Sequence, residues 1–322
     1  MHGVCALDPS EDRLASTVSG TAHPPSPRTR ERGLDVAPGT DTRVIASVAD
    51  RDAVARVFAD HAIDAVIHAG ALHKPDIARH PRQAFVDVNV TGTLNLLDAA
   101  VAHGCSRFVF TSTTSLMITQ AIRDETAQAA VWLDEGSGPL SPRNIYGVTK
   151  RAAEELCRLV RAEHGLPVIV LRTARFFPEE DDTHRALSGE NMKANEFLNR
   201  RLTPQDCAAA HVAALDKAPE VGFGTYIVSA PTPFTRDEAA ELKRGAPAVI
   251  ARHFPDAAAL YAARGWHLPH SIGRVYDASA IERDLGFRCT TDFAAILTAL
   301  REGAAMPFAH DASYTSPQLT VA

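Results

Sequence analysis

Tyr146 and Lys150, in the segment Tyr-Gly-Val-Thr-Lys, are the side chains of this sequence best suited to do chemistry. If residues 146–150 begin a helix, their spacing places the phenol and the ammonium on one face, within reach of each other. A nearby positive charge favours the phenolate and lowers the pKa of a tyrosine from its usual value of about 10. The pair therefore predicts proton transfer during redox chemistry at a carbon–oxygen bond.

A cluster of hydroxyl groups upstream strengthens this interpretation. Residues 105–112 are typical of a buried strand, and Thr113, Thr114 and Ser115 follow at its end. Open parallel sheets carry their chemistry at the carboxyl ends of strands, so we expect Thr113 to meet Tyr146 and Lys150. Taken alone, a Tyr-x-x-x-Lys match is a weak signal, and a polar strand end is often only a turn.

The elements that must position these residues alternate between strand and helix from Val44 onward. The hydrophobic periods predict strands at 44–48, 65–69, 106–112, 167–171 and 224–229, and helices at 50–61, 81–103, 146–163, 204–217, 235–243, 255–264 and 291–302. This pattern predicts an α/β fold with a doubly wound parallel sheet. In the helix near 151–163, Ala153, Leu156 and Leu159 or Val160 form the apolar stripe, which leaves Glu154, Glu155 and Arg158 outside.

The regular alternation predicts four segments. Residues 1–42 are rich in Pro, Ser and Thr and are expected to be poorly ordered, and 43–175 form the cofactor and catalytic domain. Residues 176–303 form mainly a substrate-binding region, which opens with an acidic loop or lid reaching to about residue 195, and 304–322 form a tail.

Composition excludes several classes of function. The chain has 322 residues, 45% hydrophobic and 22% charged, and a net charge of −6, which disfavours a nucleic-acid partner. No apolar stretch approaches the ~20 residues of a membrane-spanning helix, and the N-terminus shows no signal peptide, so we expect a cytoplasmic protein without a membrane partner. The five cysteines are far apart and are expected to be reduced and mostly packed.

Several motifs together resemble the extended short-chain dehydrogenase/reductases of the NAD-dependent epimerase/dehydratase family, best known from sugar-nucleotide epimerases. The resemblance covers roughly residues 33–303. It is carried by Val-Ile-His-Ala-Gly-Ala-Leu-His at 66–73, Val-Asn-Val-Thr-Gly-Thr-Leu-Asn at 88–95, Phe-Val-Phe-Thr-Ser-Thr at 108–113, Tyr146 to Lys150, Leu171-Arg172, and Asp206 before a substrate-domain helix.

The resemblance implies a Rossmann-like fold and a set of site residues. Tyr146 would move the proton while hydride passes to a nicotinamide, Thr113 would hold the same oxygen, and Lys150 would contact the cofactor ribose. The implied cofactor-binding residues are Asp35, Ser47, Val48, Ala69, Gly70, Ala71, Asn89, Lys150 and Ala174, and the implied substrate-binding residues are His73, Thr114, Arg175 and Phe177. The substrate would be a small polyol-like or sugar-nucleotide-like alcohol, and a homodimer would form through the helices near 81–103 and 146–163.

The sequence departs from the family pattern in the segment expected to bind the pyrophosphate and adenosine of the cofactor. Family members begin with a strand, a glycine-rich turn and a helix that together bind the pyrophosphate. Here Val18-Ser-Gly20 begins in that way, but the prolines that follow at 24, 25 and 27 interrupt a helix. Asp35 in Gly-Leu-Asp matches the acid that binds the adenosine ribose and favours NAD over NADP, or it is a solvated loop acid. Binding of NAD is expected to be weak.

Arg175 stands where sugar-nucleotide members often carry asparagine, and Leu116 to Ile118 replace the usual Val-Tyr-Gly. The guanidinium of Arg175 would suit a carboxylate or phosphate on the substrate. The alternative is an ion pair with Glu179, Glu180 or Asp181.

The reaction type stays open between epimerase, dehydrogenase and dehydratase. Thr114 and Ser115 stand where dehydratases carry an acid/base pair, which disfavours dehydration. Histidines 61, 68, 73 and 80 match no common ligand spacing, so no metal is expected. The sequence also lacks the Gly-x-Ser-x-Gly elbow of many serine hydrolases, which disfavours that class of enzyme.

The main rival hypothesis is a cofactor-poor or truncated relative that binds a small molecule without catalysis. The missing glycine-rich turn motivates it.

Overall fold

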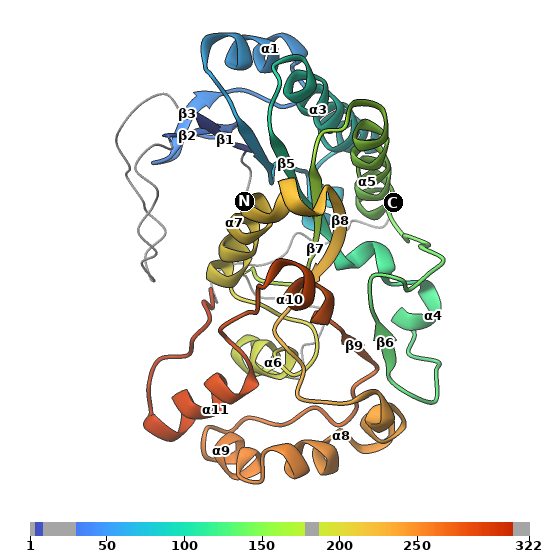
Figure 1. Ribbon diagram of the computed structural model, residues 1–322. Helices are drawn as coiled ribbons and strands as arrows, with labels where there is room; N and C mark the ends of the chain where they lie inside the picture. The colour runs from blue at the N-terminus through green and yellow to red at the C-terminus, as the bar shows by residue number, and fades with distance from the viewer. Residues whose placement is uncertain (1–3, 9–29, 178–186, 312–322) are drawn as a thin grey trace.

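The computed structural model describes residues 4–8, 30–177 and 187–311. Its main sheet has the strand order β3-β2-β1-β4-β5-β7-β8 (Figure 1). The strands are β1 (Val4–Asp8), β2 (Arg30–Asp35), β3 (Thr42–Ile45), β4 (Ala65–His68), β5 (Arg107–Thr113), β7 (Val168–Thr173) and β8 (Phe223–Val228). All neighbouring pairs are parallel except those of β1, which runs antiparallel to both β2 and β4.

Alternating side chains of the central strands build two apolar layers. Phe108, Phe110 and Val170 pack with α1 (Arg51–Asp60), α3 (Gly92–Ala102) and α5 (Ile145–His164) on one face. Val109 and Ile169 pack with α7 (Pro204–Val221) and α10 (Ser279–Leu285) on the other. Because strand side chains alternate between faces, each strand serves both layers. The predicted doubly wound α/β fold is confirmed.

A second region lies beyond one edge of this sheet, in the lower half of Figure 1. The short parallel strands β6 (Val131–Leu133) and β9 (Arg274–Tyr276) pair there. Around them lie α6 (Gly189–Glu196), α8 (Ala239–His253), α9 (Ala257–Ala263) and α11 (Phe293–Glu302), which share a third apolar cluster. The remaining short elements are α2 (Arg82–Val86), α4 (Gln120–Arg123), a π-helical turn Asp87–Thr91, and 3₁₀ turns at Lys74–Ala78, Thr114–Met117 and Arg236–Glu238.

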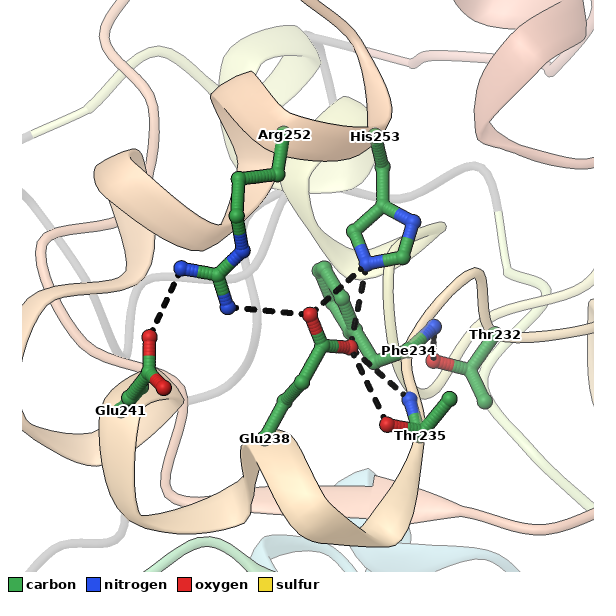
Figure 2. Close-up of polar contacts among 7 residues, drawn as sticks. All are labelled: Thr232, Phe234, Thr235, Glu238, Glu241, Arg252 and His253. Atoms are coloured by element: carbon green, nitrogen blue, oxygen red, sulfur yellow. Dashed lines mark hydrogen bonds and ion pairs between the residues drawn. The ribbon is translucent and has the colours of Figure 1, made fainter.

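A polar cluster joins the two halves of α8, which is kinked at Gly245. Glu238, just before the helix, accepts hydrogen bonds from Thr235 N at 3.0 Å and Arg252 Nη2 at 3.0 Å, and also contacts His253 (Figure 2). Arg252 also donates to Glu241 at 2.7 Å. These contacts link the two segments on either side of the kink.

Several elements differ from expectation. Strands β1 and β2 lie within 1–42, and α6 occupies part of the expected loop before residue 195. Helix α7 and strand β8, which follow residue 176, pack against or pair within the main sheet. Phe308, expected in the tail, stacks on Phe197. The segment 178–186, which includes the acidic part of the expected lid, lies outside the described residues.

Candidate active site

Thr113 and Tyr146 meet where β5 ends and α5 begins. Thr113 is the last residue of β5, and its hydroxyl oxygen accepts a hydrogen bond from Ser115 N at 3.1 Å. That contact leaves the hydroxyl hydrogen free to turn toward the phenol, and although burial raises the pKa of Tyr146, the nearby Thr113 side chain acts to lower it. The predicted convergence of these two side chains is seen in the structure.

Helix α5 presents Tyr146 and Lys150 on one buried face. Asn144 caps its first turn by accepting from Gly147 N at 3.0 Å, and Gly165 ends it in the left-handed conformation that glycine adopts most easily. Only 6% of Tyr146 and 2% of Lys150 is exposed. Both side chains therefore project from a helix whose two ends are well defined.

The ammonium of Lys150 contacts the sheet. Its Nζ donates to the carbonyl oxygen of Thr111 at 2.7 Å and lies 4.6 Å from the ring centre of Phe110. Burial lowers the pKa of Lys150 to about 7, although Cys157 and Glu154 raise it. This lysine therefore titrates near neutral pH in the ligand-free protein.

The expectation of a lowered tyrosine pKa is wrong for this structure. Burial raises the pKa of Tyr146 to about 12, the hydrogen bond from Thr113 lowers it, and the charge of Asp76 raises it further. Desolvation of the phenolate outweighs the favourable contacts. At neutral pH the ligand-free phenol is protonated.

An aromatic pair flanks the phenol. The ring of His73 lies 5.7 Å from that of Tyr146 and 5.6 Å from that of Phe177, between centroids. Arg201 also approaches this corner, because its Nη2 donates to the carbonyl oxygen of Phe177 at 2.6 Å. His73, predicted to contact substrate, thus lies against the Tyr146 ring, and Phe177, also predicted to contact substrate, lies against His73.

Asn89 has an internal role in this structure. It lies in the π-helical turn, is 1% exposed, and joins two segments near the site. Its Nδ2 donates to Leu72 O at 3.0 Å and to Thr149 Oγ1 at 3.1 Å, while its Oδ1 accepts from Leu72 N at 2.8 Å. The amide therefore positions the loop after β4 against α5, rather than presenting an open group to a cofactor.

The residues predicted at the adenosine end gather at the ends of β2 and β3. Asp35 ends β2, where its Oδ1 accepts from Ala37 N at 3.0 Å and its carbonyl oxygen accepts from Ala46 N at 2.9 Å. Ser47 Oγ accepts from Ala49 N at 3.2 Å. Val48 is buried. Of the others, Ala69, Gly70 and Ala71 directly follow β4, and Ala174 follows β7 with its N–H on Val228 O.

Two predicted substrate contacts have other partners. Thr114 is buried, and its hydroxyl donates to Thr173 O at 3.3 Å. Arg175 Nη1 lies 3.3 Å from Glu196 Oε1, so Arg175 forms an ion pair with this glutamate of α6. The acids named from the sequence, Glu179, Glu180 and Asp181, lie outside the described residues.

Sequence reasoning missed a buried ion pair behind the site. Arg172 donates from Nε and Nη2 to the carboxylate of Glu154 at 3.0 and 2.8 Å, and Ser112 Oγ also contacts it. Glu154 was expected outside α5 but is buried; of the two alternatives given for the apolar stripe, Val160 is buried and Leu159 is exposed. The sequence did offer a signal for this pair: Glu154 lies one helical turn after Lys150, and Arg172 is a charged residue inside the predicted strand at 167–171 or directly after it.

Metal ligation has no support among the residues the structure describes, which contain no group of three or more His, Cys, Asp or Glu placed around one ion. His68 is instead a core residue, with its Nε2 3.0 Å from Thr93 Oγ1, and burial lowers its pKa to about 3. The four cysteines with described side chains are free and buried. No described helix is long and apolar enough to cross a membrane.

The geometry agrees with a family-level match. Residues 10–222 match the model of the NAD dependent epimerase/dehydratase family. The chain belongs to this family.

Curated relatives in the epimerase/dehydratase family have several activities. L-arabinose 1-dehydrogenase (NAD(P)(+)) of Haloferax volcanii is 32% identical over 225 residues, covering 68% of this chain and 84% of the relative. dTDP-glucose 4,6-dehydratase of Streptomyces niveus is 29% identical over 281 residues, covering 81% and 76%. UDP-glucose 4-epimerase 2 of Oryza sativa subsp. japonica is 33% identical over 124 residues, but the match spans only 28% of that protein.

Solved structures show the same fold. UDP-N-acetylglucosamine 4-epimerase from Bacillus cereus superposes with a TM-score of 0.54 at 22% identity, covering 84% of this chain and 86% of that one. A short-chain dehydrogenase/reductase superfamily protein from Agrobacterium tumefaciens with bound NAD gives a TM-score of 0.55 at 22% identity, with coverages of 84% and 89%.

The described residues at the start of the chain give β1 an antiparallel place in the sheet. Because β1 is antiparallel to β4, Val4 faces His68 and Leu7 faces Ala65, so β1 ends at the sheet edge opposite to the site. Within the described ranges, no glycine-rich turn leads from this strand position into a helix.

Proposed function

We propose that this chain oxidises a hydroxyl group of a sugar-nucleotide-like or other polyol substrate with NAD. The observation that carries the proposal is the contact between Thr113 and Tyr146, with Lys150 one helical turn further along the same buried face. Hydroxyl, phenol and ammonium in this order suit proton transfer at a carbon–oxygen bond. Family membership and the enzymes among the relatives support catalysis over the rival of a non-catalytic binding protein.

Each residue has a distinct role in this proposal. Tyr146 exchanges the proton with the substrate oxygen, and Thr113 donates a hydrogen bond that stabilises negative charge on the phenol or the substrate oxygen. Lys150, whose pKa of about 7 lies near neutrality, gains or loses a proton close to the ribose position. His73 and Phe177 bind the substrate beside Tyr146, and their rings exclude water.

NAD supplies the hydride acceptor when bound. Lys150, Ala69, Gly70, Ala71 and Ala174 would line the nicotinamide half, and Ser47, Val48 and Asp35 the adenosine half. Asp35 supports NAD over NADP, since a carboxylate at the end of β2 suits ribose hydroxyls and repels a 2′-phosphate. The antiparallel β1 supports weak binding.

The fate of the hydride separates the possible reactions. Thr114 is turned to Thr173 O, which supports oxidation or epimerisation rather than loss of water. A dehydrogenase accumulates NADH, whereas an epimerase returns the hydride and accumulates none.

We also propose a homodimer that buries the outer faces of α3 and α5. Leu94, Val148 and Leu159 are exposed on these helices by 37%, 48% and 46%. Light scattering of the wild type and of Leu159→Glu tests this, because a dimer through this face should dissociate in the variant.

Turnover of Tyr146→Phe tests the function. The variant lacks only the hydroxyl, so it should fold normally and lose about 10²–10⁴-fold in rate, measured by NADH absorbance or by chromatography of the sugar products. Tyr261→Phe is the matched control, because its buried hydroxyl has no hydrogen-bond partner and lies in the third apolar cluster. Equal rates in wild type and Tyr146→Phe would exclude the proposed role.

A further inference from the structure

A buried histidine of α7, His211, contacts the strand that ends at the site. Its Nε2 lies 2.6 Å from the hydroxyl oxygen of Thr111 in β5, and its Nδ1 lies 2.7 Å from the carbonyl oxygen of Cys207, one helical turn earlier. A carbonyl oxygen only accepts hydrogen bonds, so Nδ1 carries the proton and Nε2 of the neutral ring accepts from Thr111. Burial lowers the pKa of His211, which favours this neutral form. His211 therefore fixes the side chain of Thr111.

The carbonyl group of the same threonine contacts the lysine of the site. Lys150 Nζ donates to Thr111 O at 2.7 Å. Strand β5 pairs with β4 only as far as Phe110, whereas it pairs with β7 as far as Thr113. Thr111 thus belongs to the part of β5 that has a strand neighbour on one side alone. Its side-chain contact with α7 supplies support that the second strand does not give there.

Helix α7 gives His211 a fixed base. In its first turn, the carboxylate of Asp206 accepts from the Thr203 hydroxyl at 2.9 Å, from Thr290 N at 2.8 Å and from Thr291 N at 3.2 Å. Asp206 is buried. These contacts tie the start of α7 to the segment before α11, five residues ahead of the histidine. A side chain on such a helix positions its partner more precisely than one on a loop does.

Other titratable groups near Lys150 hold its ammonium less directly. Glu154, one helical turn further along α5, already forms the buried ion pair with the guanidinium of β7. Burial raises the pKa of the Cys157 thiol and of the Tyr146 phenol, so both are protonated at neutral pH. Burial lowers the pKa of His68 in β4 to about 3, so this ring is uncharged. The carbonyl oxygen of Thr111 is the direct contact between the ammonium and the sheet.

We propose that His211 is a positioning residue for Lys150 and acts through Thr111: the histidine fixes the threonine side chain, and the threonine carbonyl fixes the ammonium. The chain of contacts crosses the sheet, because α5 and α7 pack on its opposite faces. The inference rests on the proposed function, since it concerns the lysine of that site. His211 takes no part in the proton transfer.

The pKa of Lys150, measured by NMR, tests the proposal without reference to activity. The chain has five lysines, so isotope-labelled lysine gives few signals, and Lys150→Met identifies the signal of Lys150. Thr111→Val removes the hydroxyl but keeps the shape, the strand propensity and the carbonyl group. In Thr111→Val and in His211→Leu, the pKa of Lys150 should fall by about 0.5–1 pH unit, because a weaker hydrogen bond disfavours the ammonium.

Three further variants separate positioning from general damage. His211→Gln supplies an amide oxygen as acceptor for Thr111 and should restore most of the wild-type pKa of Lys150. Thr225→Val, in β8 two strands away from β5, is the matched control and should leave that pKa unchanged. The double variant Thr111→Val/His211→Leu should lower the pKa no further than either single variant, since both break the same contact. Circular dichroism and the melting temperature establish that each variant is folded.

An unchanged pKa of Lys150 in folded Thr111→Val and His211→Leu, or shifts that add in the double variant, would overturn the inference. The pH profile of kcat/KM gives a second readout. In Thr111→Val it should move by the same amount as the NMR titration, whereas purely structural damage would lower the rate equally at every pH. A shifted NMR titration in a protein whose wild type shows no NAD-dependent turnover would uphold the positioning role and contradict the proposed function instead.

Discussion

Replacing Lys150 by methionine should change how the stability of the protein depends on pH. In the folded chain burial lowers the pKa of this lysine from 10.5 to about 7. Below pH 7 both the folded and the unfolded chain hold the proton. Between pH 7 and pH 10.5 only the unfolded chain holds it, so the free energy of unfolding of the wild type rises with pH. The methionine variant lacks this contribution.

The size of the effect follows from the two pKa values. One pKa unit corresponds to ~1.4 kcal/mol, so the lysine should contribute a rise of about 3 kcal/mol between pH 6 and pH 9. Urea unfolding of both proteins without cofactor at several pH values gives the difference directly. Staying at or below pH 9 avoids the range in which Tyr146, whose pKa is raised from 10.0 to about 12, makes stability fall with pH.

Lys217→Met provides the control, because Lys217 is an exposed lysine paired with Glu220. Its stability difference from wild type should stay nearly constant over the same range. If the difference between wild type and Lys150→Met is also constant from pH 6 to pH 9, Lys150 keeps its proton in the folded state and the argument from burial is refuted.

Two further variants test the internal contacts of the site. Glu154→Ala leaves Arg172 buried without its carboxylate and should lower the free energy of unfolding by about 3–5 kcal/mol, whereas Glu155→Ala, which breaks an exposed pair, should cost under about 1 kcal/mol in urea unfolding. Similar costs for the two would contradict the difference in burial. Asn89→Ala removes three hydrogen bonds, two of them to Leu72, and should cost about 2–4 kcal/mol and increase amide exchange in the loop after β4. Unchanged exchange there would show that Asn89 does not hold this loop.

Hydrophobic periodicity and cap residues predicted those strands and helices whose formation depends mainly on neighbouring residues in the sequence. The strands at β4, β5 and β7 and the helix α5 follow from hydrophobic runs and periodicity, and the hydroxyl cluster at Thr113 indicated the site. Asn144 and Gly165, which bound α5, are typical cap residues.

Features that depend on distant partners were not predictable in the same way. Glu154 is buried only because Arg172 of β7 neutralises it, and a helical pattern places such a residue in solvent. Glu196 pairs with Arg175 because α6 brings it there, in a stretch whose polar sequence had indicated a loop. The pKa of Tyr146 depends on the depth of burial, which a spacing rule does not include. The direction of β1 depends on its pairing with β2 and β4, and the sequence of β1 alone does not predict this direction.

Titration calorimetry of the whole chain with NAD, and separately with NADP, tests the central claim most directly. We propose that Tyr146 and Lys150 mark the nicotinamide end of the site, and the described residues contain no glycine-rich turn at the other end. We expect saturable, weak binding of NAD, weaker binding of NADP because of Asp35, and loss of affinity in Asp35→Ala. Absence of saturable heat with either nucleotide at millimolar concentration would contradict the proposed NAD-dependent chemistry.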